Sequence, residues 1–405
     1  MKKDIAWNTL GSVFYSFCQW FITFLVVHIA TYKEAGFLSL AMTTSSSFSA
    51  ISLFSMRNFQ VSDVRGEYNQ NEYVGSRITT CALALVACAV VSFFKNSTYQ
   101  ALCIDAFMVI RVAEAFSDVL HGENQKFGRY DYIGKSFILR GILTVASFSL
   151  GLLFIKDLFI TLIVMAGLNL LASLLFDWGK TSKLEEIRPV LCSEKVLNLL
   201  KVCLPIVVFA FLLSLENLIP KQVLEQLEGT EELGIYSTIA TPTLVVQVFA
   251  AVAFNPFLPK FSTVFVNKEY DKFLGLLKKT YAALIGMAAV VTLGAMLLGR
   301  WGLSLLFGKG ILDYYELFMP IVWVTILTAF IWILYAIVVA IRRIHWLLIG
   351  MAVDFAACYF LTKPCIEMYG KNGVSIVQLM VYAVYILFMI IVCEVAIRRD
   401  KKRVI

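Results

Sequence analysis

The sequence predicts an all-α polytopic membrane protein with twelve transmembrane helices, arranged as two pseudo-symmetric six-helix bundles. Composition is the first reason, because 60% of the 405 residues are apolar and only 16% are charged. Soluble domains have roughly 45–50% apolar residues and about a quarter charged residues, so this chain lacks the polar surface that a soluble protein of its length needs. The same composition excludes a disordered chain, which would be poor in apolar residues.

Apolar stretches long enough to cross a bilayer are the second reason. A spanning helix needs about 20 mostly apolar residues. Twelve such stretches follow one another, at 6–29, 35–56, 78–94, 100–120, 136–155, 158–177, 200–220, 233–257, 280–299, 315–341, 346–362 and 374–396. Transmembrane β-strands would instead alternate over about ten residues, and these stretches do not.

The distribution of positive charge supports this count of segments. With both termini placed on the cytoplasmic side, 25 of the 35 lysines and arginines fall in cytoplasmic loops and 8 fall outside, as the positive-inside rule requires. A wrong number of helices would scramble that alternation. The net charge of +7 is therefore a topology signal. We expect no nucleic-acid partner, because the basic residues of this chain are not gathered on one soluble surface.

A polar cytoplasmic loop at 178–199 divides the segments six and six. It predicts an N-terminal bundle at 1–177, a linker at 178–199 and a C-terminal bundle at 200–405. The run Gly36-Phe37-Leu38-Ser39 after the first segment aligns with Gly234-Ile235-Tyr236-Ser237 after the seventh. Parallel repeats of this kind are a recurrent plan among transporters, with the substrate site between the repeats.

Motifs for soluble-type chemistry are missing from the sequence. We find no Walker loop, HExxH, GxSxG or Asp-x-Asp pair. His28, His121 and His345 are far apart and lack ligand spacing, so we expect interfacial histidines, no metal site and no enzyme.

Two of the predicted segments carry polar stripes. Asn8, Ser12, Tyr15, Gln19 and Thr23 recur at helical spacing in the first segment, and hydroxyl residues crowd 43–55 in the second. Hydrogen bonding between helices is one explanation. Because two such helices follow one another, we expect them to line a hydrated cavity.

Charged residues inside the segments are the sharper signal, since each costs roughly 2.5–3.5 kcal/mol at a helix centre and must face protein or water. Arg111 and Glu114 lie one turn apart in the fourth segment, and Arg140 lies near the cytoplasmic end of the fifth. Two interpretations stay open: a structural Arg111–Glu114 ion pair, or a cationic anchor for an anionic substrate. Arg140 either joins the anchor or extends to the interface. Glu216 and Asp354 are candidates for binding a proton or sodium.

A motif after the fourth segment resembles a known family. The run from Glu114 to Ser136 contains Gly122-x-x-Gln125-x-x-x-Arg129-x-Asp131 and is similar to the corresponding region of Wzx-type polysaccharide-biosynthesis flippases, in the MOP (multidrug/oligosaccharidyl-lipid/polysaccharide) exporter superfamily. Arg57-Asn58, closing the second segment, and Asn217-x-x-Pro220-Lys221, closing the seventh, are similar too. Arginine is frequent in that family where this chain has Lys221, which retains the charge without the bidentate fork.

The resemblance implies a MATE/MOP-like fold and alternating access. It implies a flippase that moves an undecaprenyl-diphosphate-linked oligosaccharide, such as a capsule or O-antigen repeat unit, from the inner to the outer leaflet of the bacterial cytoplasmic membrane. Its partners would be the lipid-linked oligosaccharide, membrane lipids, and the polysaccharide polymerase and glycosyltransferases of the same pathway. No cofactor is expected, apart from Na⁺ or H⁺ as a coupling ion.

Candidate residues follow from the charges and the resemblance together. For the diphosphate and glycan they are Arg111, Arg140, Arg57, Asn8 and Gln19, and for the coupling ion they are Glu216, Asp354 and Glu114. Two alternatives remain. A multidrug cation antiporter of the same superfamily predicts a cavity dominated by acids, and a membrane glycosyl- or acyltransferase predicts catalytic His or Asp groups at a membrane face.

Overall fold

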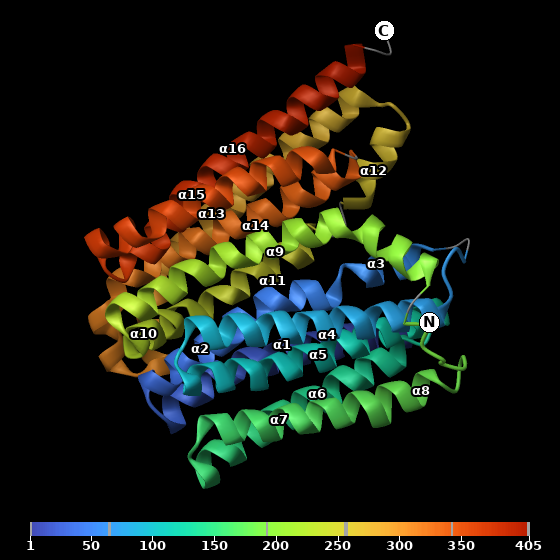
Figure 1. The fold of residues 1–405 in the computed structure, drawn as a ribbon. Coiled ribbons are helices and arrows are strands. Elements are labelled where there is room, and N and C mark those ends of the chain that lie inside the picture. Colours follow the sequence, from blue (N-terminus) through green and yellow to red (C-terminus); the bar gives the residue numbers. More distant parts are fainter. Residues whose placement is uncertain (1, 64–65, 192, 255–257, 342, 403–405) are drawn as a thin grey trace. The chain divides into compact units, whose positions relative to one another are not determined.

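The computed structural model describes the chain except for residues 1, 64–65, 192, 255–257, 342 and 403–405 (Figure 1). The described residues form helices, turns and loops, with no strand among them. In the first part of the chain the helices are α1 (Lys2–Ile29), α2 (Tyr32–Leu53), α3 (Met56–Ser62), α4 (Gln70–Lys95), α5 (Thr98–Lys126), α6 (Tyr130–Leu150), η1 (Gly151–Ile155), α7 (Leu158–Ala172), η2 (Ser173–Trp178) and α8 (Gly179–Thr181).

The long helix α9 (Glu194–Glu228) comes next. It is followed by α10 (Thr230–Ala240), η3 (Thr241–Thr243), α11 (Leu244–Phe254), α12 (Leu258–Val266), α13 (Tyr270–Phe307), η5 (Lys309–Leu317), α14 (Phe318–Ala340), α15 (Ile344–Tyr369) and α16 (Asn372–Lys402).

Every one of the twelve predicted segments coincides with a helix or a broken helix. Within the described residues, nine helices are long and apolar enough to cross a membrane. The three predicted segments beyond those nine are the hydroxyl-rich α2, the charged α5, and the α10–α11 pair, which a 3₁₀ turn at Pro242 interrupts. The all-α polytopic fold is confirmed.

Two helix boundaries differ from those predicted. The second segment ends at Leu53, so Arg57 lies in the short α3 instead of closing the segment. Helix α9 continues to Glu228, so Asn217, Pro220 and Lys221 lie inside it. Pro220 removes one backbone hydrogen bond from the interior of α9, but the helix continues beyond it.

The chain divides into two compact units, residues 1–214 and 215–405, with the boundary inside α9. The first half of α9 packs within unit 1, where Leu199, Cys203 and Val207 join a buried cluster with Tyr73 and Val119. The six-and-six division at 178–199 stays a prediction.

In unit 1, α5 is the central helix and contacts α2, α3, α4, α6 and α7. Helices α1 and α6 cross very closely at two glycines. A Cβ at Gly134 would lie 2.2 Å from the carbonyl oxygen of Trp7, and a Cβ at Gly11 would lie 2.4 Å from that of Gly134. Small residues at such crossings let helix backbones approach. This crossing lets Tyr15 of α1 reach Glu114 of α5.

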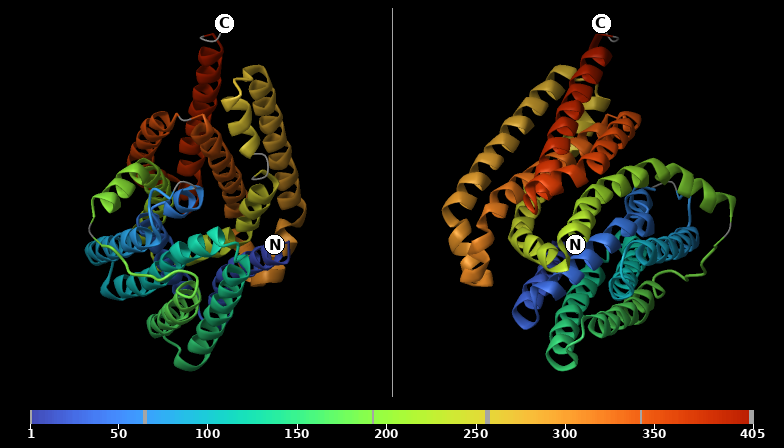
Figure 2. Two further views of the ribbon diagram at one scale, coloured as in Figure 1. Left: turned by 90° about the vertical axis from the view of Figure 1, so that its right-hand side faces the viewer. Right: turned by 60° about the vertical axis from the view of Figure 1, so that its left-hand side comes forward.

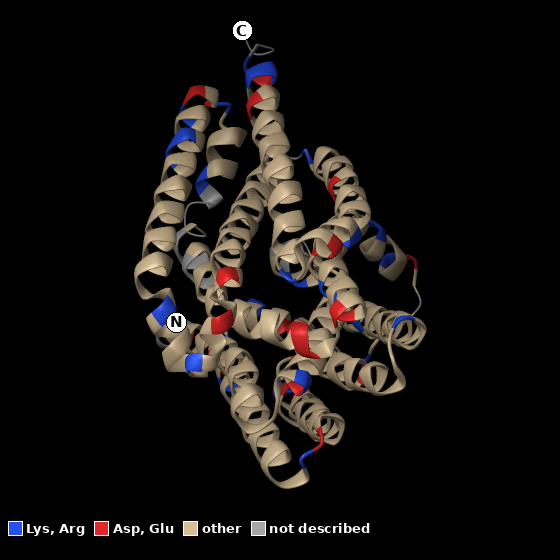
Figure 3. Ribbon diagram, turned by 90° about the vertical axis from the view of Figure 1, so that its left-hand side faces the viewer, with Lys and Arg blue, Asp and Glu red and all other residues tan. Residues whose placement is uncertain are grey.

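In unit 2, α14 is the central helix and contacts α11, α13 and α16, while α15 packs along α16 (Figure 2). The outward faces of the helices remain apolar. On α13 the exposed side chains include Ile285, Val290, Leu293, Leu297 and Leu305, which is the surface that a lipid-facing helix presents. Figure 3 shows basic residues concentrated near the ends of α12, α13 and α16, with long uncharged stretches between the ends of these helices.

Candidate functional site

The centre of unit 1 contains a polar group of side chains on α1, α5 and α6, which we call the Glu114 cluster: Tyr15, Gln19, Arg111, Glu114 and Arg140. Arg111 Nη1 lies 2.7 Å from Glu114 Oε2, while the Tyr15 hydroxyl donates to Glu114 Oε1. Gln19 Nε2 donates to the Tyr15 hydroxyl at 2.9 Å and lies 3.5 Å from the same carboxylate oxygen. The predicted Arg111–Glu114 pair therefore forms, and Gln19 joins it.

Positive charge exceeds what this carboxylate can satisfy. Arg140 is 1% exposed and within electrostatic range of Glu114 and of Asp177. Among the described residues, Nε of Arg111 and both Nε and Nη2 of Arg140 are buried without a hydrogen-bond partner. Unpaired buried donors are costly, and a guanidinium fork satisfies them best with a carboxylate or phosphate. Arg140 lies inside the protein and does not extend to the interface.

One turn along α5, Asp118 binds two arginines, and we call this group the Asp118 cluster. Arg57 Nη1 and Arg77 Nη2 each lie 3.1 Å from Asp118, one on each carboxylate oxygen. Arg57 Nη2 also donates to Gln125 at 3.3 Å. Arg77 is completely buried, whereas the Arg57 side chain is 27% exposed. Arg57 is thus the more accessible arginine of the cluster.

The interruption between helices α2 and α3 positions Arg57. Phe54 and Ser55 both adopt the left-handed region, with φ of 49° and 51°, which non-glycine residues rarely occupy. Arg77 Nη1 donates to the Ser52 carbonyl at 2.7 Å, and the Thr80 hydroxyl donates to the same oxygen at 3.0 Å. These donors satisfy a carbonyl at the end of α2 and hold the break in place.

A third polar group connects α5 to the π-helical turn η2. Asp177 accepts from the Ser117 hydroxyl at 2.6 Å and lies 3.3 Å from His121 Nε2. His121 is 1% exposed, so the expectation of an interfacial histidine is wrong here: Asp177 and the His121 ring pair inside the bundle. No group of three or more metal-ligating side chains occurs in the part of the chain that the structure describes.

The hydroxyls of α2 do not provide the expected evidence of a hydrated cavity. Thr43, Ser47 and Ser52 donate to carbonyls three or four residues earlier on their own helix, as hydroxyls in apolar helices commonly do. Asn8 is half-buried on α1, next to the backbone of Gly134. The hydrogen bonds of the Glu114 cluster join Tyr15, Gln19, Arg111 and Glu114 and do not involve Asn8.

The family-like motif forms the end of α5 and the turn into α6. Gly128 adopts φ of +68° in that turn, which favours glycine. Arg129 makes a two-pronged pair with Asp131, at 2.9 and 3.1 Å, and its guanidinium lies 3.7 Å from the Tyr132 ring centre. Gln125, a third motif residue, is the partner of Arg57. The motif therefore shapes the loop and positions one site arginine.

In unit 2, Glu216 of α9 and Asp354 of α15 lie together, with their carboxyl groups within electrostatic range of each other. Glu216 is completely buried and Asp354 nearly so. Both Glu216 oxygens, Asp354 Oδ2 and the Tyr382 hydroxyl have no hydrogen-bond partner among the described residues. Two buried carboxylates cannot both be ionised side by side unless a cation compensates them. The pair is therefore suited to hold a proton or a small cation.

The sequence interpretation missed Arg77 and Asp177. The predicted segment 78–94 begins one residue after Arg77, yet Asn69 and Glu72 form a capping box that starts α4 at Gln70. The pattern Asn-x-x-Glu before an apolar run is a helix-start signal, and it would have placed Arg77 inside the helix. Asp177 follows Asn169 and Ser173 at steps of four, a stripe that predicts a shared buried face.

No protein-family model matches the sequence. A relative from Staphylococcus aureus, the capsular polysaccharide biosynthesis protein CapF, is 26% identical over 315 residues, which cover 76% of this chain and 78% of that protein. A solved multidrug resistance MATE family transporter of the MOP superfamily matches with a TM-score of 0.69 at 13% identity, covering 98% of this chain and 99% of that one. The chain has the MOP exporter fold.

A solved structure of the lipid II flippase MurJ matches with a TM-score of 0.70 at 12% identity, covering 97% of this chain and 89% of that one. The MATE/MOP-like fold that the resemblance implies is confirmed. Together with the nine long apolar helices of the described residues, this indicates a multi-pass membrane protein.

Proposed function

We propose that this MOP-fold protein flips an undecaprenyl-diphosphate-linked oligosaccharide from the inner to the outer leaflet of the bacterial cytoplasmic membrane by alternating access. The observation that carries the proposal is the surplus of guanidinium donors in unit 1. In the three polar groups around α5, Arg57, Arg77, Arg111 and Arg140 face only three carboxylates, those of Glu114, Asp118 and Asp177. A site with this balance suits an anionic ligand and disfavours an organic cation.

Exposure distinguishes the arginines that could contact the diphosphate. The Arg111 side chain is 18% exposed and that of Arg57 is 27% exposed, whereas Arg140 is buried. We assign direct contact to Arg111 and Arg57, each of which would exchange a carboxylate oxygen for a phosphate oxygen. Arg140 adds positive charge behind Glu114. Gln19, through its hydrogen bond to Tyr15, positions that carboxylate.

The physics of the substrate agrees with this assignment. Each unpaired sugar hydroxyl in hydrocarbon costs several kcal/mol, so a glycan needs a polar path, while the polyprenyl tail is stable in lipid. When the inside of the membrane is negative, outward movement of negative charge is favourable by roughly 2.3 kcal/mol per charge per 100 mV. The biosynthetic role named for the CapF relative supports a glycan substrate.

The return of the empty carrier would use Glu216 and Asp354. Both Glu216 oxygens and Asp354 Oδ2 are buried and lack hydrogen-bond partners, and neither acid forms an ion pair with a lysine or arginine, among the described residues. Binding of H⁺ or Na⁺ would neutralise the two acids. The fraction of carriers that hold the ion would then depend on the ion gradient.

Reconstitution tests the proposal. Purified protein in liposomes should expose a diphosphate-linked oligosaccharide to a membrane-impermeant glycan oxidant within minutes, whereas protein-free liposomes leave the inner half protected. The same liposomes should not accumulate organic cations such as ethidium. Ethidium transport without glycan flipping would instead identify a multidrug antiporter, and a covalently altered lipid would identify a transferase.

A further inference from the structure

Helices α12 and α13 form a hairpin that is closed along one side by aromatic rings. The Phe261 and Phe273 rings lie 5.3 Å apart and the Phe265 and Phe273 rings 6.1 Å apart; Phe261 and Phe273 are buried. The turn between the helices is held by backbone hydrogen bonds, including Glu269 N to Val264 O at 3.1 Å. The two helices are therefore fixed relative to each other.

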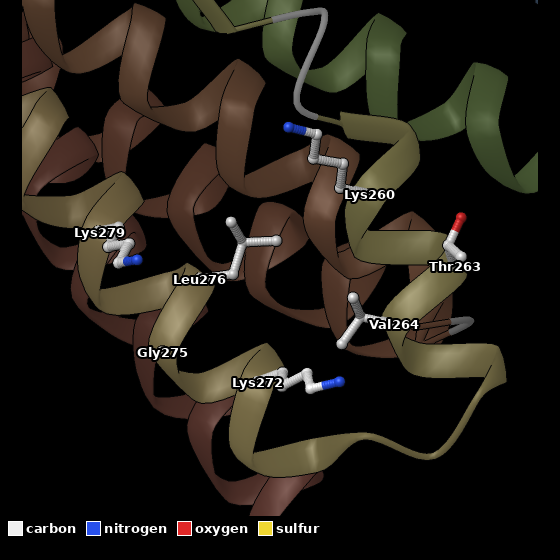
Figure 4. Close-up of a pocket in the computed structure, with 7 residues that line it drawn as sticks. All are labelled: Lys260, Thr263, Val264, Lys272, Gly275, Leu276 and Lys279. Atoms are coloured by element: carbon white, nitrogen blue, oxygen red, sulfur yellow. The ribbon is translucent and has the colours of Figure 1, made fainter.

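The other side of the hairpin is an open groove of about 530 Å³, with three lysines around it (Figure 4). Lys260 comes from α12, and Lys272 and Lys279 come from α13, two turns apart. Between them the walls are apolar, formed by Val264 and Leu276, which Figure 4 shows pointing into the space between the helices. The groove thus combines amines with a hydrocarbon-like surface.

Space and charge both favour a ligand. A Cβ built at Gly275 would have nothing within 4 Å, so the wall recedes at this point. None of the residues that line the groove is acidic. Glu269, which is not one of the lining residues, lies 3.0 Å from Lys272. The lining itself contributes three lysines and no carboxylate.

The length of α13 places the groove at headgroup depth. At 1.5 Å per residue, its 38 residues span about 57 Å, well beyond the roughly 30 Å of a bilayer core. Its exposed apolar residues run from Ile285 to Leu305, a distance of about 30 Å. Lys279 lies about 9 Å before that stretch, at the end that the positive-inside rule assigns to the cytoplasm.

We propose that the α12–α13 groove binds one anionic membrane phospholipid. Its phosphate would lie among Lys260, Lys272 and Lys279, and its acyl chains would run along Val264 and Leu276 toward the exposed face of α13. Basic pockets at the cytoplasmic ends of transmembrane helices recognise acidic headgroups in this way. A soluble anion would leave the apolar walls uncovered. The proposal does not depend on the transported substrate.

Native mass spectrometry of the full-length protein in detergent tests the site. We expect phosphatidylglycerol to bind at least tenfold more tightly than phosphatidylcholine with the same acyl chains. Each lysine near an acidic headgroup contributes about fivefold in affinity, so K260Q/K272Q/K279Q should weaken phosphatidylglycerol binding about a hundredfold. Because all three side chains are exposed, the variant should keep the wild-type thermal unfolding midpoint.

A matched pair of single variants is the control. Lys279 and Lys278 are neighbours on α13 and both are exposed, but only Lys279 lines the groove. K279Q should weaken phosphatidylglycerol binding about fivefold, and K278Q should leave it unchanged. Equal effects of the two variants would refute the site, as would equal binding of the two phospholipids. Displacement by millimolar inorganic phosphate, or stronger binding of polyprenyl phosphate, would also overturn the proposal, by identifying a soluble anion or the transport substrate as the ligand.

Discussion

Removal of the Arg111 guanidinium should weaken substrate binding strongly without unfolding the protein. The Arg111–Glu114 pair is short, at 2.7 Å, but both side chains are 18% exposed. Breaking a fully buried pair costs about 3–5 kcal/mol. Here Glu114 keeps its hydrogen bond from Tyr15, so we expect Arg111→Ala to cost about 1–2 kcal/mol of stability.

The effect on substrate affinity should be larger. A hydrogen bond to a charged group contributes about 1.5–3 kcal/mol, so loss of Arg111 should weaken binding of a diphosphate-linked lipid by roughly 10- to 100-fold. Arg111→Lys keeps the positive charge but loses the bidentate geometry of the guanidinium. Its affinity for the substrate should lie between those of wild type and Arg111→Ala. Native mass spectrometry with the diphosphate-linked lipid measures the affinity, and the liposome assay measures flipping.

Glu114→Gln separates an anchor from a structural pair. If phosphate displaces Glu114 from Arg111, the neutral glutamine should strengthen substrate binding while Arg111→Ala weakens it. A purely structural pair predicts the same direction for both variants, and partial recovery in the swapped variant R111E/E114R. Arg188, an exposed arginine that pairs with Glu186, provides the control Arg188→Ala. Wild-type flipping by Arg111→Ala, or recovery in the swapped variant, would refute the anchor.

Three further predictions concern other parts of the molecule. Glu216→Gln should make flipping insensitive to imposed Na⁺ and pH gradients in liposomes; an unchanged gradient response would rule out coupling at this acid. Gly134→Val should lower the thermal unfolding midpoint by about 5 °C, because a Cβ at this position would lie 2.2 Å from the Trp7 carbonyl oxygen. The control Gly167→Ala should leave the midpoint unchanged, because a Cβ there has nothing within 4 Å. Equal midpoints for the two variants would contradict the close crossing of α1 and α6. Burial would raise the pKa of Asp63, but hydrogen bonds from the Tyr68 and Glu67 amides and the Tyr73 hydroxyl lower it below its ordinary value. Ionised Asp63 therefore stabilises the fold above its unfolded-state pKa, and this contribution is lost as pH falls through the lower folded-state pKa. The difference in thermal unfolding midpoint between wild type and Asp63→Asn should therefore shrink when the pH is lowered from 7. A difference that stays constant with pH would contradict this prediction.

Much of the candidate site was predictable from helical spacing. Arg111 and Glu114 one turn apart predicted a shared face, and the cost of charge in lipid predicted that this face would be turned inward. The structure pairs them. Spacing along one helix cannot identify partners on another, and so the contributions of Tyr15 and Arg77, which reach α5 from α1 and α4, were missed.

Composition and the alternation of charged loops determined that this chain is a polytopic helical membrane protein, because hydrocarbon excludes unpaired backbone and charge everywhere along the chain. Tertiary packing decided which arginines are satisfied and which keep open donors. That outcome depends on where helices cross, as at Gly134 and Trp7, and on the break at Phe54 and Ser55 that brings Arg57 to Asp118. Such contacts join residues distant in sequence, and no local pattern encodes their geometry.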